Sequence, residues 1–492
     1  MGAARSSAGC RVRARDGTIG CMRLRRNMIP FAAALLAVLS AGACRSAPPT
    51  VAWHPCPESA ALDCGSIAVP IDWAHPDGAT IDLAVTRKRA TGTHPTGTLI
   101  SLPGGPGTSG VDELRTQDQF SPALHDAFDI VSFDPRGVGR SHPIRCDQGL
   151  LAQPDTAPES GHTLAELQAY AHRLADSCRT FTGPLFEHVD EISVARDVDA
   201  LRAALGRSTV ALYGRSYGTM SGQAYLELFP QRVRALLIDS VDDHSLDGPG
   251  FLAAEARAGG DTFGEFVSWC DREAACALHG SDIPGLYDRL WDSALHGTLA
   301  DSHGRPSTAL GLSTAVTQRL YQPDWTALAN DLAALRDRPP ISGPVPWPQP
   351  TGVAVSAGQL AVCSDWTFDI PDQARWTDLW SEQNRNAGPL HAHFAWAAAT
   401  LCSGWPIPPA DPAHLPSVTG GPAVLVMNSI HDPATPYEWA AAVAAHTPRA
   451  TLLTYDGWGH GVYSRTPCTT AAGDAYLISG TVPAAGTHCP AA

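Results

Sequence analysis

The sequence predicts an α/β protein built on a mostly parallel sheet, with helices on both faces and a large cap. Short apolar runs that suit buried strands alternate with helical patterns along most of the chain, which is typical of a parallel sheet with covering helices. The alternation stops near residue 241 and resumes near residue 415. Because the interrupting segment is long and helical in pattern, with clusters of Trp and Pro, we expect it to form a mainly helical cap over the carboxyl edge of the sheet.

We expect the sheet to have eight strands, with the cap inserted after the sixth. The first two strands flank a turn signal, His-Pro-Asp-Gly at 75–78, and the next two end in loops rich in Pro and Gly. The eight expected strands are Ile67–Asp72, Thr80–Thr86, Thr98–Leu102, Phe128–Phe133, Val210–Tyr213, Ala235–Ile238, Ala423–Met427 and Ala450–Thr454.

Two helices are expected beside the fifth strand. Apolar residues recur at helical spacing from Val194 to Leu205, and Gly206 follows them as a typical C-cap. A second helix is expected from about residue 217 to residue 229, because Pro230 would stop it.

The chain divides into four predicted parts, of which residues 1–44 are an export signal. Three arginines at 23, 25 and 26 precede an apolar stretch, and small residues at 41–43 suit a cleavage site; either Met1 or Met22 can be the true start. Cleavage after Ala43 would leave Cys44 first, as in a bacterial lipoprotein, so Cys44 is a candidate for lipidation. Position 41 is Ala where Leu is usual, so simple secretion stays open. We assign residues 45–240 and 416–492 to the core and residues 241–415 to the cap.

The charge of the chain argues against nucleic acid as a partner. The whole chain has 34 Lys and Arg against 49 Asp and Glu, and residues 1–44 hold seven arginines and one aspartate. The remainder therefore carries 27 basic and 48 acidic residues. Such a surface repels phosphate backbones and anionic lipids, so we expect no nucleic acid and no membrane contact beyond a possible lipid anchor. The sequence contains no C-x-x-C or H-E-x-x-H motif, and we expect neither a metal nor a cofactor.

The cysteines suggest disulfides in an oxidising compartment. Of the 13 cysteines, Cys10 and Cys21 lie in the leader, and ten remain if Cys44 carries lipid. Sequence alone does not determine how cysteines pair, but pairing between neighbours is the simplest arrangement. The neighbouring pairs are Cys56–Cys64, Cys146–Cys178, Cys270–Cys276, Cys363–Cys402 and Cys468–Cys489.

Ser216 is the candidate nucleophile. It lies in Gly-Arg-Ser-Tyr-Gly, between an expected strand and an expected helix, which is the context of a nucleophile elbow. The flanking glycines suit a turn too tight for side chains. The chain contains 45 glycines, so the bare motif can also arise by chance, and its context decides.

Asp432 and His460 are the candidate partners of Ser216. Each follows a late expected strand, and the chain order Ser, Asp, His is that of α/β-hydrolases. In that chemistry, His460 would take the Ser216 proton and Asp432 would orient and stabilise the imidazolium. Asp239 and Asp242 follow the sixth expected strand and are rival positions for the acid.

Backbone amides near Ser216 are the candidate oxyanion donors. The Tyr217 N–H directly follows the nucleophile, and Gly104 or Gly105 in the Pro-Gly-Gly-Pro-Gly loop would supply the second N–H. The alternative for this loop is a structural turn.

Several motifs together resemble a known family. PGGPGTSG, DPRGVGRS, GRSYGT, HDPATP and GWGHG occur in this order, and the chain is similar to the proline-iminopeptidase-like branch of the α/β-hydrolases. It resembles more closely the exported tripeptidyl aminopeptidases of actinobacteria, with their TAP-like C-terminal domain. The resemblance implies a serine exopeptidase that removes short peptides, tripeptides above all, from free N-termini, with Ser216, Asp432 and His460 as its triad. One departure is Asp-Ser-Val-Asp-Asp at 239–243, where such enzymes more often read Asp-Gly-Val-Val-Asp-Pro, and it concerns substrate preference.

An aminopeptidase also needs carboxylates to bind the free α-ammonium group of its substrate. For any one acidic residue, a place on the solvated surface is the commoner outcome. The candidates are Glu265, Asp271, Glu273 and Asp242, followed by Asp243 and Asp365. Thr435 could hydrogen-bond close to Asp432, and Arg136 suits a structural anchor of its loop.

Two other functions stay open. A carboxylesterase or lipid esterase would use the same three residues, because this fold hosts many acyl-transfer reactions. A catalytically inactive member could instead serve as a binding lipoprotein, although the complete Ser, Asp and His set argues against it. Oligomeric state is not indicated by the sequence.

Overall fold

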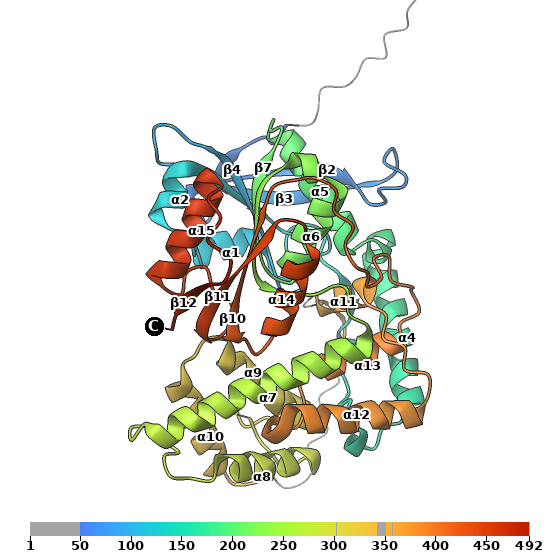
Figure 1. The fold of residues 1–492 in the computed structure, drawn as a ribbon. Helices are drawn as coiled ribbons and strands as arrows, with labels where there is room; N and C mark the ends of the chain where they lie inside the picture. Colours follow the sequence, from blue (N-terminus) through green and yellow to red (C-terminus); the bar gives the residue numbers. More distant parts are fainter. Residues whose placement is uncertain (1–49, 302, 342–350, 357, 492) are drawn as a thin grey trace, which may run out of the picture. The chain divides into compact units, whose positions relative to one another are not determined.

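The computed structural model describes residues 50–301, 303–341, 351–356 and 358–491 (Figure 1). The predicted export signal and Cys44 lie outside the described residues. Among the helices in the described ranges, none is both long and apolar enough to cross a membrane.

The central sheet contains ten strands in the described residues, in the order β1-β2-β3-β5-β4-β7-β8-β10-β11-β12. Neighbours from β5 to β12 are parallel, whereas β1, β2, β3 and β5 pair antiparallel. The strands are β1 (His54–Cys56), β2 (Ser59–Pro70), β3 (Thr80–Lys88), β4 (Gly97–Leu102), β5 (Phe128–Phe133), β7 (Val210–Ser216), β8 (Val233–Val241), β10 (Val424–His431), β11 (Ala450–Trp458) and β12 (Thr487–Pro490).

The predicted number of eight strands was two too low. The eight expected runs correspond to β2, β3, β4, β5, β7, β8, β10 and β11, and the cap does follow the sixth of them, β8. The additional strands, β1 and β12, lie at the two edges of the sheet. They have three and four residues, which is too short to show an alternating pattern in sequence.

Helices cover both faces of the sheet, as the alternating pattern predicts (Figure 1). Successive residues of β7 point to opposite faces: Leu212 packs in the cluster of α5, α6 and α14, whereas Ala211 and Tyr213 pack in the cluster of α1, α2 and α15. These helices are α1 (Gly110–Thr116), α2 (Pro122–Ala127), α5 (Glu191–Ala204), α6 (Gly218–Leu228), α14 (Tyr437–His446) and α15 (Pro467–Ser479). The expected C-cap Gly206 follows α5 with φ +67°, a left-handed conformation that glycine adopts without strain.

A third apolar cluster forms the core of the cap. The helices between β8 and β10 contribute most of it, and α7 also packs against β10 (Figure 1). These helices are α7 (Gly248–Arg272), α8 (Ile283–Leu295), α9 (Ala309–Tyr321), α10 (Trp325–Arg336), α11 (Val362–Asp365), α12 (Gln373–Ala387) and α13 (Ala395–Ser403).

The cap also receives residues from the part of the chain that we assigned to the core. Helix α4 (Leu164–Thr182) packs against α12 and α13, and Leu164 and Leu167 belong to the apolar cluster of the cap. It follows a short helix, α3 (Gln148–Leu151), and a strand, β6 (Arg145–Asp147), which pairs with β9 (Val353–Val355) from the inserted segment. The cap is therefore built from two stretches of chain.

All five expected cysteine pairs are disulfide-bonded in the structure. Cys146–Cys178 joins β6 to α4, and Cys363–Cys402 joins α11 to α13 within the cap. Cys468–Cys489 attaches the edge strand β12 to α15. Each bond restricts the unfolded chain and so favours the folded state.

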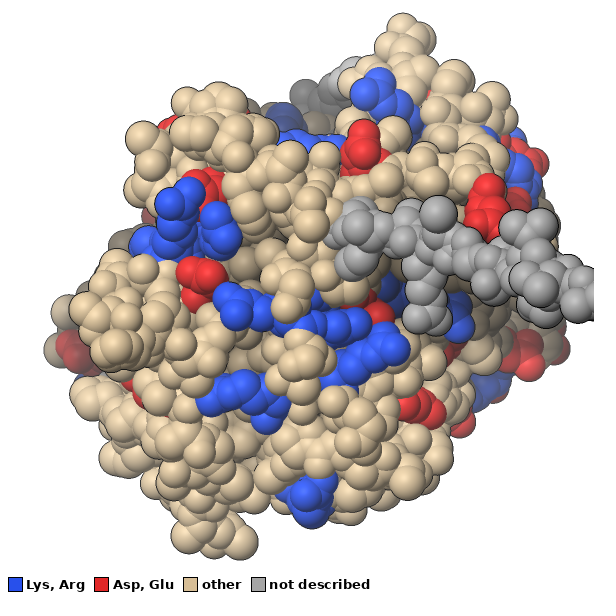
Figure 2. Space-filling view, turned by 90° about the horizontal axis from the view of Figure 1, so that it is seen from above, with Lys and Arg blue, Asp and Glu red and all other residues tan. Residues whose placement is uncertain are grey.

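Basic side chains gather on the face shown in Figure 2, although the chain as a whole is acidic. Many arginines of the molecule share a carboxylate. Arg87 and Arg89 both contact Asp63, and Arg202 and Arg232 both contact Asp199. Such pairing neutralises much of the basic charge. That the protein has no nucleic-acid partner stays a prediction from the sequence.

Arg136 anchors its loop beneath the surface, in the role that its sequence context suggests. Its guanidinium and the carboxylate of Asp197 are fully buried and joined by two hydrogen bonds of 2.8 and 2.6 Å. The guanidinium also donates to the carbonyl oxygens of Pro70, Ile71 and His188. Burying an ion pair carries a large desolvation penalty, which this complete set of partners offsets.

We predict that Arg136→Ala destabilises the fold by about 3–5 kcal/mol, because it leaves the Asp197 carboxylate buried without its cation. The shift of the urea unfolding midpoint relative to the wild type measures the effect. Arg385→Ala, at an exposed position of α12, is the matched control and should change the midpoint little. Equal midpoints for the two variants would contradict the anchoring role.

Candidate active site

Ser216 lies on a sharp turn between β7 and α6. It is the last residue of β7, its φ is +56°, and α6 begins two residues later at Gly218. A Cβ atom at position 214 would lie 2.4 Å from the Gly218 carbonyl oxygen, and one at position 218 would lie 2.3 Å from the Leu102 carbonyl oxygen. Only glycine fits at both positions, and this close packing of the backbone explains the two glycines of the Gly-Arg-Ser-Tyr-Gly motif. The Ser216 side chain itself is partly exposed.

The loop after β4 packs directly against this turn. A Cβ atom at position 104 would lie 3.2 Å from Ser216 Cβ and 3.6 Å from the Tyr217 nitrogen. Tyr217 begins the turn into α6, where backbone N–H groups have no partner within the helix. The Gly104 backbone and the Tyr217 amide therefore flank Ser216, where two N–H groups could stabilise an oxyanion. Gly105 has φ +117°, and a Cβ atom there would lie 2.7 Å from the Gly107 nitrogen.

Tyr217 is itself held by a buried carboxyl group. Its hydroxyl donates to Asp365 Oδ2 at 2.5 Å, and Asp365 Oδ1 accepts from the Glu191 amide at 2.9 Å. Burial and the neighbouring charge of Glu191 raise the pKa of Asp365 well above its ordinary value. Asp365 is thus a support for Tyr217.

His460 is bonded to the buried carboxylate of Asp432. The Nδ1 atom of His460 lies 3.0 Å from Asp432 Oδ1 and 3.1 Å from Oδ2. Asp432 Oδ1 also accepts from the amides of Ala434 and Thr435, and Oδ2 accepts from the Thr435 hydroxyl at 2.9 Å. With Nδ1 held in this way, His460 can exchange a proton through Nε2.

The pKa of Asp432 reflects these contacts. Burial alone would raise it, because it disfavours the charged form. The charge of His460 and the hydrogen bonds from His460, Thr435 and Ala434 outweigh burial and lower the pKa below its ordinary value. Asp432 therefore stays ionised beside the imidazole.

The loop that carries His460 is fixed from both the sheet and the cap. Asp239, one of the rival acids, accepts hydrogen bonds from the amides of Val462 and Tyr463 and does not bond to the His460 ring. The Gly461 amide donates to Ser240 Oγ at 2.7 Å, beside the end of β7. From the cap, the Tyr321 carbonyl oxygen accepts from the His460 amide at 2.8 Å.

Comparison with known proteins places the chain in a family. A model described as "alpha/beta hydrolase fold" matches residues 97–267, and one described as "TAP-like protein" matches residues 389–489. The serine protease Hip1 of Mycobacterium tuberculosis is 32% identical over 478 residues, which cover 89% of this chain and 91% of that protein. The chain belongs to the α/β-hydrolase family. The TAP-like match begins upstream of residue 416, where we predict that the C-terminal part of the core begins.

Two further relatives of this hydrolase differ in their named activities. A tripeptidyl aminopeptidase of Streptomyces coelicolor is 31% identical over 458 residues, 87% of this chain and 83% of the relative. A carboxylesterase B of Mycobacterium tuberculosis is 32% identical over 479 residues, 90% of each chain. The hydrolase is therefore an enzyme of the serine hydrolase class.

Two buried acids lie next to the Asp432–His460 pair. Burial raises the pKa of Asp242 well above its ordinary value, and the charges of Glu255 and Asp432 raise it further. Burial also raises the pKa of Glu255, although the nearby His393, at 2.5 Å, opposes this effect. The Oδ2 atom of Asp242 has no hydrogen-bond partner among the described residues. Asp242 is therefore a buried carboxyl group without a cation among the described residues, whereas Glu255 has His393 beside it.

Sequence reasoning named Asp242 but missed Glu255. Glu255 lies in the first third of α7, and nothing in the local sequence distinguishes it from the other acids of the cap. His393 connects it to the catalytic loop, because the His393 Nε2 atom donates to the Pro433 carbonyl oxygen at 3.0 Å.

The other acids proposed for substrate binding either have partners of their own or lie at the far end of α7. Asp271 and Glu273 are exposed at the end of α7, about 24 Å along the helix from Glu255. Glu265 accepts from the Trp458 indole N–H at 3.1 Å, and Asp243 accepts from the amide and hydroxyl of Ser245.

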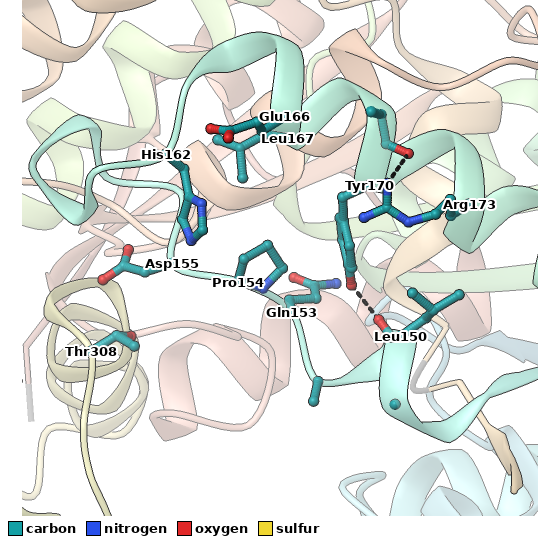
Figure 3. Close-up of a pocket in the computed structure, with 13 residues that line it drawn as sticks. Leu150, Gln153, Pro154, Asp155, His162, Glu166, Leu167, Tyr170, Arg173 and Thr308 are labelled. Carbon is teal, nitrogen blue, oxygen red and sulfur yellow. Dashed lines mark hydrogen bonds between the residues drawn. The ribbon is translucent and has the colours of Figure 1, made fainter. Parts of the chain in front are cut away.

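A separate pocket of about 610 Å³ lies between α3, α4 and the start of α9 (Figure 3). It is not lined by Ser216, Asp432 or His460. Two of its polar groups have local partners: Tyr170 donates to the Leu150 carbonyl oxygen, and Glu166 belongs to the N-terminal cap of α4. This pocket contributes nothing that we can assign to the chemistry at Ser216.

We predict that Gly104→Ala lowers kcat by about 100- to 1,000-fold, the range for loss of an oxyanion donor. The new Cβ would lie 2.7 Å from the Arg215 carbonyl oxygen and push the loop away from Ser216. Gly97→Ala, at the first residue of β4, meets no atom within 4 Å and is the matched control, whose kcat should stay at the wild-type value. Equal kcat values for both variants would argue against the role of this loop.

We predict that Asp432→Asn lowers kcat by about 10⁴-fold, because the imidazole loses the carboxylate that orients it. Ser216→Ala should abolish turnover while the circular dichroism spectrum stays unchanged. Asp242→Asn serves as the comparison, since Asp242 was a rival for the acid. A large loss of kcat in Asp242→Asn with little loss in Asp432→Asn would reverse the assignment.

Proposed function

We propose that this hydrolase is an exported serine aminopeptidase that removes short peptides, tripeptides above all, from free N-termini. The observation that carries the proposal is the buried carboxyl group of Asp242, whose Oδ2 atom has no hydrogen-bond partner among the described residues and whose charge interacts with those of Glu255 and Asp432. The named activities of two relatives, a serine protease and a tripeptidyl aminopeptidase, support a peptidase.

In the proposed mechanism, Ser216, His460 and Asp432 form a catalytic triad. His460 Nε2 takes the Ser216 proton while Oγ attacks the scissile carbonyl carbon, and the amides of Tyr217 and Gly104 stabilise the oxyanion. The imidazolium, held by Asp432, then donates its proton to the leaving amine and leaves an acyl-enzyme on Ser216. Water activated by His460 hydrolyses the acyl-enzyme and restores the serine.

The buried acids suit recognition of the substrate's α-ammonium group. A carboxyl group that is buried without a cation is expensive to ionise, and an incoming ammonium would remove that penalty. Asp242 is well placed for this. Its amide donates to Thr219 Oγ1 and its carbonyl oxygen accepts from Gln223 Nε2, which fixes its backbone to α6, and its Oδ2 atom has no partner among the described residues. Anchoring the amino terminus at a fixed place relative to Ser216 would make the enzyme an exopeptidase with a set product length.

A carboxylesterase is the second candidate, and the relative named carboxylesterase B favours it. It would use the same Ser216, His460 and Asp432 chemistry. A neutral ester, however, offers no cation to Asp242 and Glu255, and that difference separates the two functions.

We also propose that the enzyme works outside the cytoplasm, either secreted or anchored by lipid at Cys44. The five disulfides support this proposal, since such bonds persist in oxidising compartments.

We predict that tripeptide amides with a free N-terminus are cleaved with a kcat/KM roughly 10- to 100-fold above that of their N-acetylated forms. Asp242→Asn and Glu255→Gln should reduce this ratio, chiefly by raising KM for the free peptides. Asp271→Asn, an exposed acid of the same helix as Glu255, is the matched control.

Short acyl esters are assayed alongside the peptides. Efficient ester cleavage without amide cleavage would overturn the peptidase proposal in favour of the esterase. Equal rates on free and acetylated peptides would be compatible with a peptidase, but they would contradict the proposed role of the buried acids in binding the α-ammonium group.

A further inference from the structure

Two histidines and an aspartate meet where the cap joins the core. His244 lies just after β8, at the entrance to the cap, and Asp411 and His414 lie in the segment that leads from α13 back to β10. His244 and Asp411 are buried, and His414 is partly exposed. One side-chain nitrogen or oxygen from each of the three residues lies within 4.8 Å of the others.

Both imidazoles direct Nδ1 at the same carboxylate. His244 Nδ1 lies 3.8 Å from Asp411 Oδ2, and His414 Nδ1 lies 3.6 Å from Asp411 Oδ1. These distances are too long for hydrogen bonds. They are close to the separation of about 3.3 Å between neighbouring ligands of a tetrahedral zinc ion with bonds of 2.0–2.1 Å.

The opposite nitrogen of each imidazole already has an acceptor. His244 Nε2 lies 2.7 Å from the Asp365 carbonyl oxygen, and His414 Nε2 lies 3.1 Å from Glu227 Oε2. A carbonyl oxygen can only accept, so Nε2 of His244 carries its hydrogen, and the lone pair of the neutral ring is on Nδ1. Metal-binding histidines almost always donate their second N–H to a carbonyl or carboxylate in this way.

Backbone contacts compete with a metal at both imidazoles, and for His244 the contact is with the backbone of Asp411. His414 Nδ1 also lies 3.0 Å from the Pro412 carbonyl oxygen, to which it would donate in the absence of an ion. Binding of a metal ion would release the Nδ1 proton, while the Nε2–H of His414 would stay hydrogen-bonded to Glu227.

A small cavity adjoins the three side chains. Its volume is about 10 Å³, close to what one water molecule needs, and its lining includes Glu227 and Gln223 as well as the three residues. A water molecule there could complete a four-coordinate site.

We propose that His244 Nδ1, His414 Nδ1 and a carboxylate oxygen of Asp411 bind one Zn²⁺ ion, with water as the fourth ligand. Two imidazoles and one carboxylate favour zinc over magnesium or calcium, which prefer sites made of oxygen alone. The ligands lie at the two ends of the segment inserted between β8 and β10, and Glu227 belongs to α6, the helix that follows Ser216. The ion would therefore hold the cap on the core and is distinct from the chemistry at Ser216.

The test measures zinc binding by the full-length chain after removal of metal with a chelator. Isothermal titration should show one Zn²⁺ site with a Kd of about 1 μM or below, and the thermal unfolding midpoint should rise with added Zn²⁺. Asp411→Asn and His414→Gln should each weaken binding by at least about 10-fold and remove the shift in the midpoint. His296→Gln is the matched control, because His296 forms an exposed pair with Asp292 outside the cluster and its loss should change nothing.

Co²⁺ is the second probe and needs no variant. The wild-type chain should give the intense visible absorption of tetrahedral Co²⁺, and Zn²⁺ should abolish it at one equivalent. The proposal is overturned if the metal-free wild type binds neither ion and keeps the same midpoint at a roughly hundredfold excess of Zn²⁺. It is also overturned if the two variants fold and bind like the wild type. The three residues would then form only an ionic contact.

Discussion

The close approach of backbones at the end of β7 is the constraint on which the site depends. The turn at Ser216 brings the start of α6 against the loop after β4, and side chains at positions 104, 214 and 218 would enter the space of neighbouring backbone atoms. This packing gives Ser216 its positive φ and places the Tyr217 amide beside the loop. The same contact therefore shapes both the nucleophile and the proposed oxyanion site, and neither can shift without the other.

The remaining parts of the site are supported by buried polar groups from different layers of the molecule. Asp239, at the end of β8, fixes the loop that carries His460, and Tyr321 from the cap accepts a hydrogen bond from the same loop. Asp365 from the cap holds the Tyr217 hydroxyl. The cap thus does more than cover the sheet, because Tyr321 and Asp365 form hydrogen bonds with His460 and Tyr217 of the proposed catalytic site. A firmly seated cap is what the proposed zinc ion would provide.

Much of the fold and part of the site could be predicted because their signals are local. Each of the eight longer strands contains a stretch rich in apolar residues, and Ser216, Asp432 and His460 lie in short motifs close behind such stretches. The edge strands β1 and β12 could not be predicted, since they are too short to show periodicity and depend on their neighbours for pairing. Glu255 and the cluster at His244 could not be predicted, because each depends on contacts with residues far away in sequence. The contribution of α4 to the cap likewise depends on long-range packing.

The central claim is that the packed turn presents Ser216 as the one activated nucleophile of this enzyme. Labelling the purified chain with a fluorophosphonate, followed by peptide mapping in the mass spectrometer, tests it most directly. The account predicts one adduct per chain, on the peptide that contains Ser216, formed much faster than on free serine. An unlabelled chain, or an adduct on a different residue, would contradict the account.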